Sequence, residues 1–528
     1  MIFHPLTRIL SRHIYRGKVI NKGLNIYHYS KMNQPFSTKV EKVEIPKLKD
    51  SSLLRQNAFI NGEWVKSKSE NTYSVLDPAT NNEIGKVPEM NAEDTKEAIK
   101  AARESYDIWA SQSAKYRHDL LQKWYSLMMD NHQDLAIILT LENGKPLKEA
   151  VGEIKYGASF IEWFAEEARR TYGDVIPAPI KNSKFIVQKQ PVGVVGIITP
   201  WNFPNAMITR KLGAALAAGC TVVVKPSDCT PFSALALAEL AVRAGFPKGV
   251  INVVTTEQHT KEVGLELTTN PDVKKVSFTG STTVGKLLMQ QCSSTLKKIS
   301  LELGGNAPFI VFDDANVDAA IEGLIASKFR ASGQTCVCAN RIYVQSSIYA
   351  EFASRLADKV SEFKVGNGFD PQTTLGPLIN GKAIDKVTRH IEDAVAKGAE
   401  ILVGGVRRSG NFFDPTVLTG VSADAIISSE ETFGPVAALY KFDKDDEVIK
   451  LANNTTVGLA GYFYSRDVGR CWKVADALEV GMVGVNTGTV SNAEIPFGGV
   501  KESGIGREGS KYGIDEYLNI KYINFGGL

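Results

Sequence analysis

The apolar residues in the middle of the chain fall in short runs that are separated by longer, helix-like stretches. The runs are residues 192–198, 221–224, 250–254, 275–278 and 307–312, and the helical stretch 231–244 lies between two of them. Nearly continuous apolar strands that alternate with helices are typical of a parallel sheet covered on both faces. The pattern therefore predicts an α/β fold.

Further predicted elements lie on both sides of that sheet in the sequence. Residues 94–113 and 116–142 each have the periodicity of a long helix. A second α/β pattern follows, with helices at 316–329, 347–364, 447–453 and 471–478 and strands at 400–403 and 481–486. No apolar run approaches the roughly 20 residues that a membrane-spanning helix requires. We expect a cofactor domain, then a catalytic domain, and no membrane association.

The first 40 residues differ in charge from the rest of the chain. They contain seven Lys and Arg residues and no Asp or Glu, and Arg8, Arg12 and Arg16 recur on one face of a helix. Such N-termini are typical of mitochondrial transit peptides, which predicts import into the matrix. The alternative is a disordered tail on a cytoplasmic protein. Because the whole chain carries only +3, its remainder is mildly acidic, and we expect no nucleic-acid partner.

The six cysteines are too scattered for a disulfide framework. No His/Cys cluster has zinc-ligand spacing, so we expect no metal. Cys336 follows Gly333-Gln334-Thr335 at a predicted helix-to-loop junction, where backbone N–H groups are expected to lower the pKa of the thiol. A thiolate attacks carbonyl carbon and leaves readily from a thioester, although an isolated cysteine is more often an inert buried thiol.

Three other segments carry candidate chemistry. Gly280-Ser281-Thr282-Thr283-Val284-Gly285 closes a strand and opens a helix, as pyrophosphate-binding turns do, but it lacks the middle glycine of the usual fingerprint. Lys225 ends a strand, where parallel sheets bind ligands. Glu302 has apolar neighbours, which raise the pKa of a carboxyl group toward that of a general base. Taken singly, the first segment is explained at least as well as a plain strand–helix turn. A solvated strand end is the better explanation of Lys225 alone, and an ion-paired strand glutamate is the better explanation of Glu302 alone.

Taken together, these segments resemble the aldehyde dehydrogenase superfamily. The motifs that carry the resemblance stand in the family's order between about residue 58 and the C-terminus: Thr199-Pro200-Trp201-Asn202-Phe203-Pro204, Lys225-Pro226, the turn from Gly280 to Gly285, Glu302-Leu303-Gly304-Gly305, Gly333-Gln334-Thr335-Cys336, Glu431-Thr432-Phe433-Gly434-Pro435 and Pro496-Phe497-Gly498-Gly499. The resemblance implies a Rossmann-type cofactor domain over residues 58–303, an α/β catalytic domain over 304–503 and an oligomerisation segment over 504–528. Bridging strands near 171–190 and 517–525 imply a homodimer or homotetramer.

The resemblance also implies roles for single residues. Cys336 attacks the aldehyde, Asn202 and the backbone N–H of Cys336 stabilise the oxyanion, and Glu302 activates the water that hydrolyses the thioester. NAD or NADP accepts the hydride, and the residues implied in binding it are Thr199, Pro200, Trp201, Lys225, Ser227, Asp228, Gly280, Ser281, Gly285, Leu303, Glu431 and Phe433. The choice of cofactor stays open, because Asp228 keeps the charge of the family's glutamate but is one methylene shorter.

Arg210, Arg330 and Ser491 resemble the carboxylate clamp of the succinate-semialdehyde dehydrogenases in this family. We therefore expect oxidation of succinate semialdehyde, an intermediate of 4-aminobutyrate breakdown. Glutarate semialdehyde or neutral aldehydes are the alternative substrates, and a thioester hydrolase or a non-catalytic binding protein is the alternative class. Cys338 resembles the second thiol of a redox switch, with a passive thiol as the other interpretation.

Overall fold

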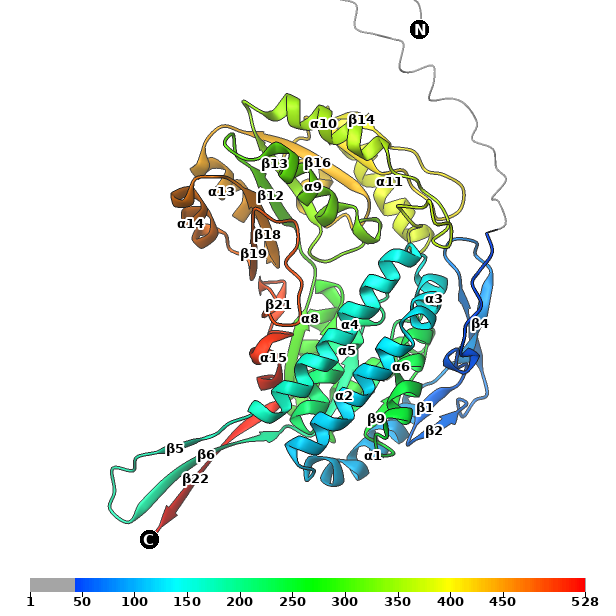
Figure 1. Cartoon of the computed structure of the whole chain (residues 1–528), viewed down its shortest axis with the longest axis vertical. Coiled ribbons are helices and arrows are strands. Elements are labelled where there is room, and N and C mark those ends of the chain that lie inside the picture. Colours follow the sequence, from blue (N-terminus) through cyan, green and yellow to red (C-terminus); the bar gives the residue numbers. More distant parts are fainter. Residues whose placement is uncertain (1–42, 528) are drawn as a thin grey trace, which may run out of the picture. The chain divides into compact units, whose positions relative to one another are not determined.

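The computed structural model describes residues 43–527, and the predicted transit peptide over residues 1–40 lies outside the described residues. Among the described residues, eight strands form a first sheet (Figure 1). In sheet order they are β2 (Glu63–Val65), β1 (Ala58–Ile60), β9 (Ile251–Val253), β8 (Thr221–Lys225), β7 (Val194–Ile198), β10 (Val273–Thr279), β11 (Lys298–Glu302) and β21 (Gly504–Ile505). Strands β7 to β11 are parallel to one another, so the predicted parallel α/β sheet is confirmed.

Helices cover both faces of the first sheet, as the apolar strands require. One face is covered by α1 (Ala92–Ala110), α7 (Thr260–Thr269) and α8 (Thr282–Cys292). The other is covered by α5 (Ala206–Ala218) and α6 (Pro231–Ala244), with α2 (Ala114–Asp130), α3 (His132–Asn143) and α4 (Leu147–Glu167) packed outside them. The small antiparallel pair β3 (Thr72–Leu76) and β4 (Glu83–Pro88) precedes α1.

A second sheet contains seven strands of the described part of the chain. Its order is β14 (Glu400–Val403), β15 (Thr416–Thr419), β16 (Val436–Phe442), β13 (Ala339–Gln345), β12 (Ala307–Val311), β18 (Ala460–Tyr464) and β19 (Met482–Val485). Helices α9 (Val317–Lys328) and α10 (Tyr349–Ser361) lie on one face, and α11 (Gly381–Ala396), α12 (Ile426–Ser429), α13 (Asp445–Asn453) and α14 (Val468–Ala477) pack on the other. The pair β17 (Val457–Gly458) and β20 (Val500–Lys501) completes this part.

One predicted helix, residues 116–142, was wrong in its extent. The chain forms two helices there, because α2 ends at Asp130 and α3 begins at His132. Asn131 between them donates its side-chain amide to the carbonyl of Leu127 at 2.8 Å, a local bond that competes with continuation of the helix. No helix of residues 43–527 is long and apolar enough to span a bilayer.

The two sheets are joined by a very short connection. Strand β11 ends at Glu302 and β12 begins at Ala307, and the residues between them can span at most about 14 Å. The carboxyl edge of the first sheet must therefore lie beside the amino edge of the second. Cys336 precedes β13 and Glu431 precedes β16 at that amino edge. The topology thus places the predicted site where the sheets meet.

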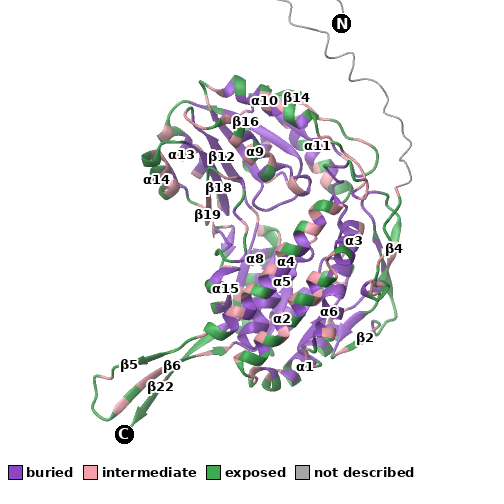
Figure 2. Ribbon diagram, viewed as in Figure 1, coloured by how far each residue is buried: buried purple, intermediate pink, exposed green. Residues whose placement is uncertain are grey.

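A three-stranded antiparallel sheet extends from the rest of residues 43–527. It consists of β5 (Asp174–Ile176), β6 (Ser183–Pro191) and β22 (Leu518–Gly526), the last of which follows the short helix α15 (Ser510–Asp515). Figure 2 shows these strands mostly as exposed. The segment expected to serve oligomerisation, residues 504–528, also contributes β21 to the first sheet.

The backbone immediately before Cys336 is unusual. Ala331 and Ser332 have φ values of 50° and 56°, and Gly333 has a φ of 73°. A carboxylate oxygen of Glu149 accepts the N–H of Ala331 at 2.9 Å, and the Ser332 hydroxyl donates to the carbonyl of Gly376 at 2.8 Å. Left-handed residues of this kind persist only when their surroundings hold them, so these contacts fix the approach of the chain to Cys336.

We expect Gly333→Ala to destabilise the protein more than Gly398→Ala. Both glycines have positive φ, which costs an alanine about 1–2 kcal/mol. A Cβ atom at Gly333 would also lie 2.2 Å from the carbonyl oxygen of Gly434, whereas one at Gly398 has nothing within 4 Å. Urea unfolding should show roughly 1–3 kcal/mol of additional loss for Gly333→Ala. Equal losses would contradict a tight backbone contact at Gly333.

Candidate active site

Three elements bring the predicted catalytic residues together. Asn202 follows β7 and Glu302 is the last residue of β11, both at the carboxyl edge of the first sheet, while Cys336 comes from the second. The side-chain amide of Asn202 donates to the carbonyl of Gln334 at 3.0 Å, across the junction of the sheets. The Glu302 carboxyl group is a direct electrostatic neighbour of the Cys336 thiol. Asn202, Glu302 and Cys336 are all buried.

The environment of Cys336 contradicts the expected low thiol pKa. Burial, and then the neighbouring Glu302 carboxylate, raises the pKa of the Cys336 thiol well above its ordinary value. Cys336 is only 9% exposed. The 3₁₀ turn Arg330–Gly333 lies before it, so Cys336 does not itself begin a helix. The thiol is therefore protonated at neutral pH, and burial is the cause.

The environment of Glu302 confirms the expected raised pKa. Burial, and then the charge of Glu508, raises the pKa of Glu302 to about 7. The Cys336 thiol contacts this carboxyl group and opposes the rise, and no other residue among 43–527 hydrogen-bonds its oxygens. A carboxyl group with a pKa near neutrality and no other partner can take a proton from a bound molecule.

A charged cluster that the motifs did not reveal lies behind Glu302. Lys211 donates to Glu508 and, at 2.7 Å, to the hydroxyl of Thr279, whose residue pairs with Glu302 in the sheet. Arg210 binds the other oxygen of Glu508 at 3.2 Å. Burial alone would raise the pKa of Glu508, but the charges of Lys211 and Arg210 outweigh it and keep the pKa below its ordinary value. The 297 residues between Lys211 and Glu508 hide this pair from any local pattern.

Two glycines of the predicted motifs allow close packing around the site, one against the backbone of Cys336 and one against Leu303. A Cβ atom at Gly305 would lie 2.6 Å from the carbonyl oxygen of Cys336. A Cβ atom at Gly285 would lie 2.4 Å from the side chain of Leu303, so this glycine lets α8 pack against the end of β11. These two glycines are required for packing rather than for backbone freedom.

The residues predicted to bind a dinucleotide follow the carboxyl ends of neighbouring strands. Lys225 ends β8, with Ser227 and Asp228 just beyond it, and Gly280 and Ser281 connect β10 to α8. The Ser281 hydroxyl caps α8 by accepting the N–H of Val284, and the start of the helix is exposed. Burial lowers the pKa of Lys225, and the backbone N–H of Thr199 donates to the Lys225 carbonyl at 3.2 Å, which places the loop of Pro200 beside it. This arrangement fits a ribose and a pyrophosphate.

The predicted nicotinamide side of the site is built from both sheets. The rings of Trp201 and Phe433 meet edge to face with centroids 5.6 Å apart. One carboxylate oxygen of Glu431 accepts the N–H of Gly305 at 3.2 Å, and burial raises the pKa of Glu431 to about 7. Phe433 has a φ of 55°, an uncommon value for an aromatic residue. Within residues 43–527, no group of His, Cys, Asp and Glu side chains is arranged to hold a metal ion.

The structure separates the three residues predicted to bind a substrate carboxylate. Arg330 and Ser491 line a cavity of about 240 Å³ together with Tyr156 and Phe203. Arg210 is 1% exposed, and its guanidinium donates to the Tyr156 hydroxyl at 2.5 Å as well as to Glu508. Arg210 therefore lies behind Tyr156 and already has a carboxylate partner, whereas Arg330 faces the cavity. Arg330 and Ser491 thus line the cavity directly, whereas Arg210 reaches it only through the Tyr156 hydroxyl. The binding of a substrate carboxylate by Arg210, Arg330 and Ser491 stays a prediction.

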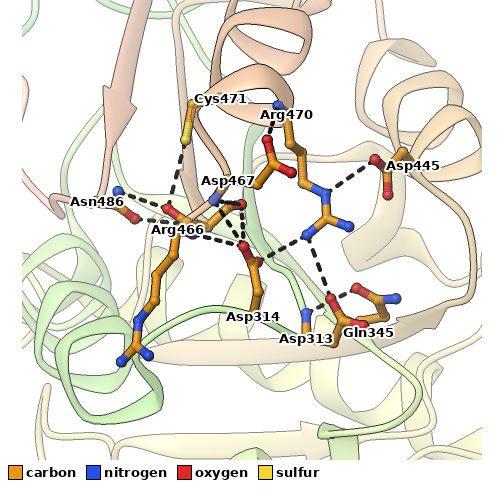
Figure 3. Close-up of polar contacts among 10 residues, drawn as sticks. Asp313, Asp314, Gln345, Asp445, Arg466, Asp467, Arg470, Cys471 and Asn486 are labelled. Atoms are coloured by element: carbon orange, nitrogen blue, oxygen red, sulfur yellow. Dashed lines mark hydrogen bonds and ion pairs between the residues drawn. The ribbon is translucent and has the colours of Figure 1, made fainter.

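A polar network joins Asp314, Arg470 and Asn486, the last of which precedes the loop of Ser491 in the sequence (Figure 3). Asn486, at the end of β19, accepts the N–H of Ser465 at 3.0 Å and donates to its carbonyl at 2.9 Å. Asp314 accepts the hydroxyl of Ser465 at 2.9 Å and binds Arg470 at the same distance. Residues that follow β12, β18 and β19 are thus joined at the carboxyl edge of the second sheet, and the loop starts from a fixed point.

Cys338 lies two residues beyond the nucleophile and is also buried and free. Its thiol donates to the carbonyl of Lys328 at 3.5 Å. Burial raises the pKa of the Cys338 thiol, and the nearby charge of Lys328 opposes that rise. A regulatory disulfide between Cys336 and Cys338 stays a prediction.

Comparisons with known proteins agree with this geometry. The sequence model of the aldehyde dehydrogenase family matches residues 64–523. The chain is 58% identical to a glutarate-semialdehyde dehydrogenase of Pseudomonas putida over 90% of this chain and 99% of the relative. It is 57% identical to the NADP⁺ succinate-semialdehyde dehydrogenase of Escherichia coli, over 91% and 100%. It is 56% identical to the mitochondrial succinate-semialdehyde dehydrogenase of Rattus norvegicus, over 90% and 92%.

Solved structures of related enzymes also superpose closely on this chain. An E. coli NADP-dependent enzyme superposes with a TM-score of 0.90 at 57% identity, and covers 91% of this chain and 100% of its own. Betaine aldehyde dehydrogenase from Staphylococcus aureus, in complex with NAD⁺, superposes with a TM-score of 0.87 at 38% identity, over 89% and 95%.

We expect alkylation of Cys336 by iodoacetamide to accelerate as pH rises, because only the thiolate reacts and the thiol pKa is raised. Glu302→Gln removes the second cause of that raised pKa, so alkylation at a fixed pH should become faster. Each unit by which the pKa falls increases the thiolate about tenfold at a pH below it. Peptide mapping by mass spectrometry in a Cys338→Ala background identifies the modified thiol. Slower alkylation of Glu302→Gln would instead mean that Glu302 deprotonates Cys336.

Proposed function

The chain belongs to the aldehyde dehydrogenase family, and we propose that it oxidises succinate semialdehyde to succinate with a nicotinamide cofactor. The observation that carries the proposal is the cavity with Arg330, Ser491 and Tyr156 on its wall. Arg330 lies six residues before Cys336 in the sequence, and Tyr156 is an electrostatic neighbour of the Cys336 thiol. A guanidinium in a half-buried cavity pairs well with the far carboxylate of a semialdehyde. Glutarate semialdehyde, which is one methylene longer, is the second candidate, because a relative with that name is equally similar.

The geometry supports a two-stage reaction. The Cys336 thiol first releases its proton to solvent, the thiolate sulfur then forms a bond to the aldehyde carbon, and the carbonyl electron pair moves to the oxygen. Asn202 has one N–H bound to Gln334; its second N–H, with the backbone N–H of Cys336, stabilises the oxyanion. A bound nicotinamide supplies the two-electron acceptor for the hydride that leaves this carbon. Glu302 then takes a proton from water as the new C–O bond forms and the C–S bond breaks, which releases the acid.

We propose that the cofactor is NAD rather than NADP. Lys225 and Ser227 offer donors to the ribose hydroxyls, but the charge beside them is negative. Asp228 accepts the Ser227 hydroxyl at 3.0 Å, and burial together with the charges of Asp228 and Glu89 raises the pKa of Glu257. Such an acidic surrounding favours two free ribose hydroxyls and disfavours a 2′-phosphate.

We propose that the chain forms a homo-oligomer through β5, β6 and β22. Both outer strands of this sheet leave backbone groups unpaired within residues 43–527, and such edges are normally covered. Large apolar side chains on it are exposed: Tyr172, Val175, Ile176, Ile520, Tyr522 and Phe525. A second copy of the chain would cover both the edges and these side chains.

We also propose that the protein is imported into mitochondria. The proposal rests on the basic, acid-free composition of residues 1–40, and the similarity to a mitochondrial relative supports it. Bacterial relatives of the same similarity leave the cytoplasm as the alternative.

We expect Arg330→Ala to raise KM for succinate semialdehyde roughly 10- to 100-fold, the value of a charge-assisted hydrogen bond, and to change KM for propanal little. The matched variant is Arg210→Ala. Because Arg210 binds Glu508 and Tyr156 rather than the cavity, its loss should affect both aldehydes alike. Steady-state kinetics of the two variants with the two aldehydes measure this. Equal changes in KM for both aldehydes in Arg330→Ala would contradict a contact between Arg330 and the substrate carboxylate.

We expect Asp228→Ser to increase the ratio of kcat/KM for NADP to that for NAD by roughly 10- to 100-fold, since a like-charge contact is removed. Asp228→Glu keeps the charge and should keep the preference for NAD. The reduced nicotinamide is followed by its absorbance with each cofactor in turn. If wild type prefers NADP, or if Asp228→Ser does not change the ratio, the charge of Asp228 does not choose the cofactor.

A further inference from the structure

We propose that Lys145, paired with Glu153, is a positioning residue that holds Asn202 in the orientation needed to bind the oxyanion. This inference rests on the proposed function, in which Asn202 stabilises negative charge on the substrate oxygen. The family motifs identified in the sequence do not include Lys145 or Glu153. Lys145 lies two residues before α4 begins and Glu153 lies in the second turn of that helix, both outside either sheet.

The ammonium group of Lys145 contacts the oxyanion loop directly. Its Nζ donates to the backbone carbonyl of Asn202 at 2.8 Å and to a carboxylate oxygen of Glu153 at 2.5 Å. It also lies 4.0 Å from the centre of the Phe203 ring. Lys145 is 3% exposed. These three contacts fix the position of Nζ, and Nζ in turn holds the carbonyl of Asn202.

Glu153 holds the other end of the same loop. Its second carboxylate oxygen accepts the backbone N–H groups of Asn205 and Ala206, at 3.0 and 3.3 Å. These N–H groups lie at the start of α5, where a carboxylate is favoured. Residues 202–206 are therefore tied to the Lys145–Glu153 pair at both ends. A shift of either partner moves the backbone from which the Asn202 amide projects.

The energetics of the pair favour a geometric role. Removing two charges from water costs about as much as their attraction returns, so a buried ion pair adds little net stability compared with apolar side chains of the same size. Such a pair instead fixes the orientation of the backbone groups that it binds, because each hydrogen bond has a preferred angle. The Asn202 amide has only one N–H left for the oxyanion after its bond to Gln334, so a small rotation of its backbone would misdirect that N–H.

Lys145 also lies on the wall of the cavity that holds Arg330 and Ser491, which suggests the rival role of attracting the substrate carboxylate. Its charge, however, is compensated by Glu153 and its Nζ is bound to two oxygens. A carboxylate would have to displace one of them. We therefore expect Lys145 to matter equally for substrates with and without a terminal carboxylate.

The test is a double-mutant cycle between Lys145→Met and Asn202→Ala, read as kcat for succinate semialdehyde and for propanal. Loss of one oxyanion donor lowers kcat about 10²–10³-fold. Lys145→Met should lower kcat roughly 10- to 100-fold with both aldehydes, and should cost almost nothing further in the Asn202→Ala background. Lys148→Met, the same change at an exposed lysine of α4, is the matched control and should leave kcat unchanged.

Three outcomes overturn the inference. Additive losses in the double variant mean that Lys145 does not act through Asn202. A loss confined to succinate semialdehyde means that Lys145 contacts the substrate. If kcat is unchanged in Lys145→Met but falls in Asn202→Ala, Lys145 has no role in positioning Asn202. If wild type forms no reduced nicotinamide from any aldehyde, the proposed function fails instead.

Folding of the variants is checked independently of turnover. Alkylation of Cys336 by iodoacetamide counts intact sites, because this thiol reacts without the oxyanion contact. Should Lys145→Met fail to fold, Lys145→Arg and Glu153→Gln enter the same cycle. Arginine can still reach both oxygens and should retain most of the activity, whereas Glu153→Gln should lower kcat with both aldehydes. A lower kcat for Lys145→Arg than for Glu153→Gln would contradict the positioning role.

Discussion

The short connection between β11 and β12 is the constraint on which the site depends. Because it is so short, the carboxyl edge of one parallel sheet must face the amino edge of the other. The first sheet then presents Asn202, Lys225, Gly280 and Glu302, and the second presents Cys336 and Glu431. The bond from Asn202 to Gln334 and the close approach of Gly305 to Cys336 hold the two edges together. Neither sheet alone contains all three of the residues predicted to be catalytic, Asn202, Glu302 and Cys336.

Burial at this junction raises the pKa of both Glu302 and Cys336, and the consequences for the two groups differ. It brings the pKa of Glu302 to about 7, which suits a base that must gain and lose a proton near neutrality. The same burial raises the pKa of Cys336 and leaves the thiol protonated in the unliganded protein. The charges that could relieve this, Lys211 and Arg210, are already bound to Glu508.

Buried carboxylates organise the loops around the site from outside the two sheets. Glu153 caps α5, Glu142 accepts the first N–H groups of α6 at 2.7 and 2.9 Å, and Glu149 holds the left-handed Ala331. All three come from α3 and α4, so these helices carry the second layer of the site. This explains why Lys145 and Glu153 matter in a structure whose chemistry lies on strands and loops.

The sequence by itself predicted the α/β fold and the strands β7, β8, β9 and β10 of the first sheet, because apolar runs are local properties of the chain. It placed the run 307–312 in the same sheet, whereas β12 belongs to the second sheet. Short motifs indicated Cys336 as the nucleophile and Glu302 as the base, and these roles stay predictions. The sequence also indicated the raised pKa of Glu302, since that follows from apolar neighbours in sequence. It missed α4, α11 and the central strands β13, β16 and β18, and it joined α2 and α3 across Asn131. Only the tertiary structure decided which arginine faces the cavity, that the Cys336 thiol is protonated, and that Lys145 binds the Asn202 loop. Those features arise from burial and from contacts between residues tens to hundreds of positions apart, and the chain must fold before either exists.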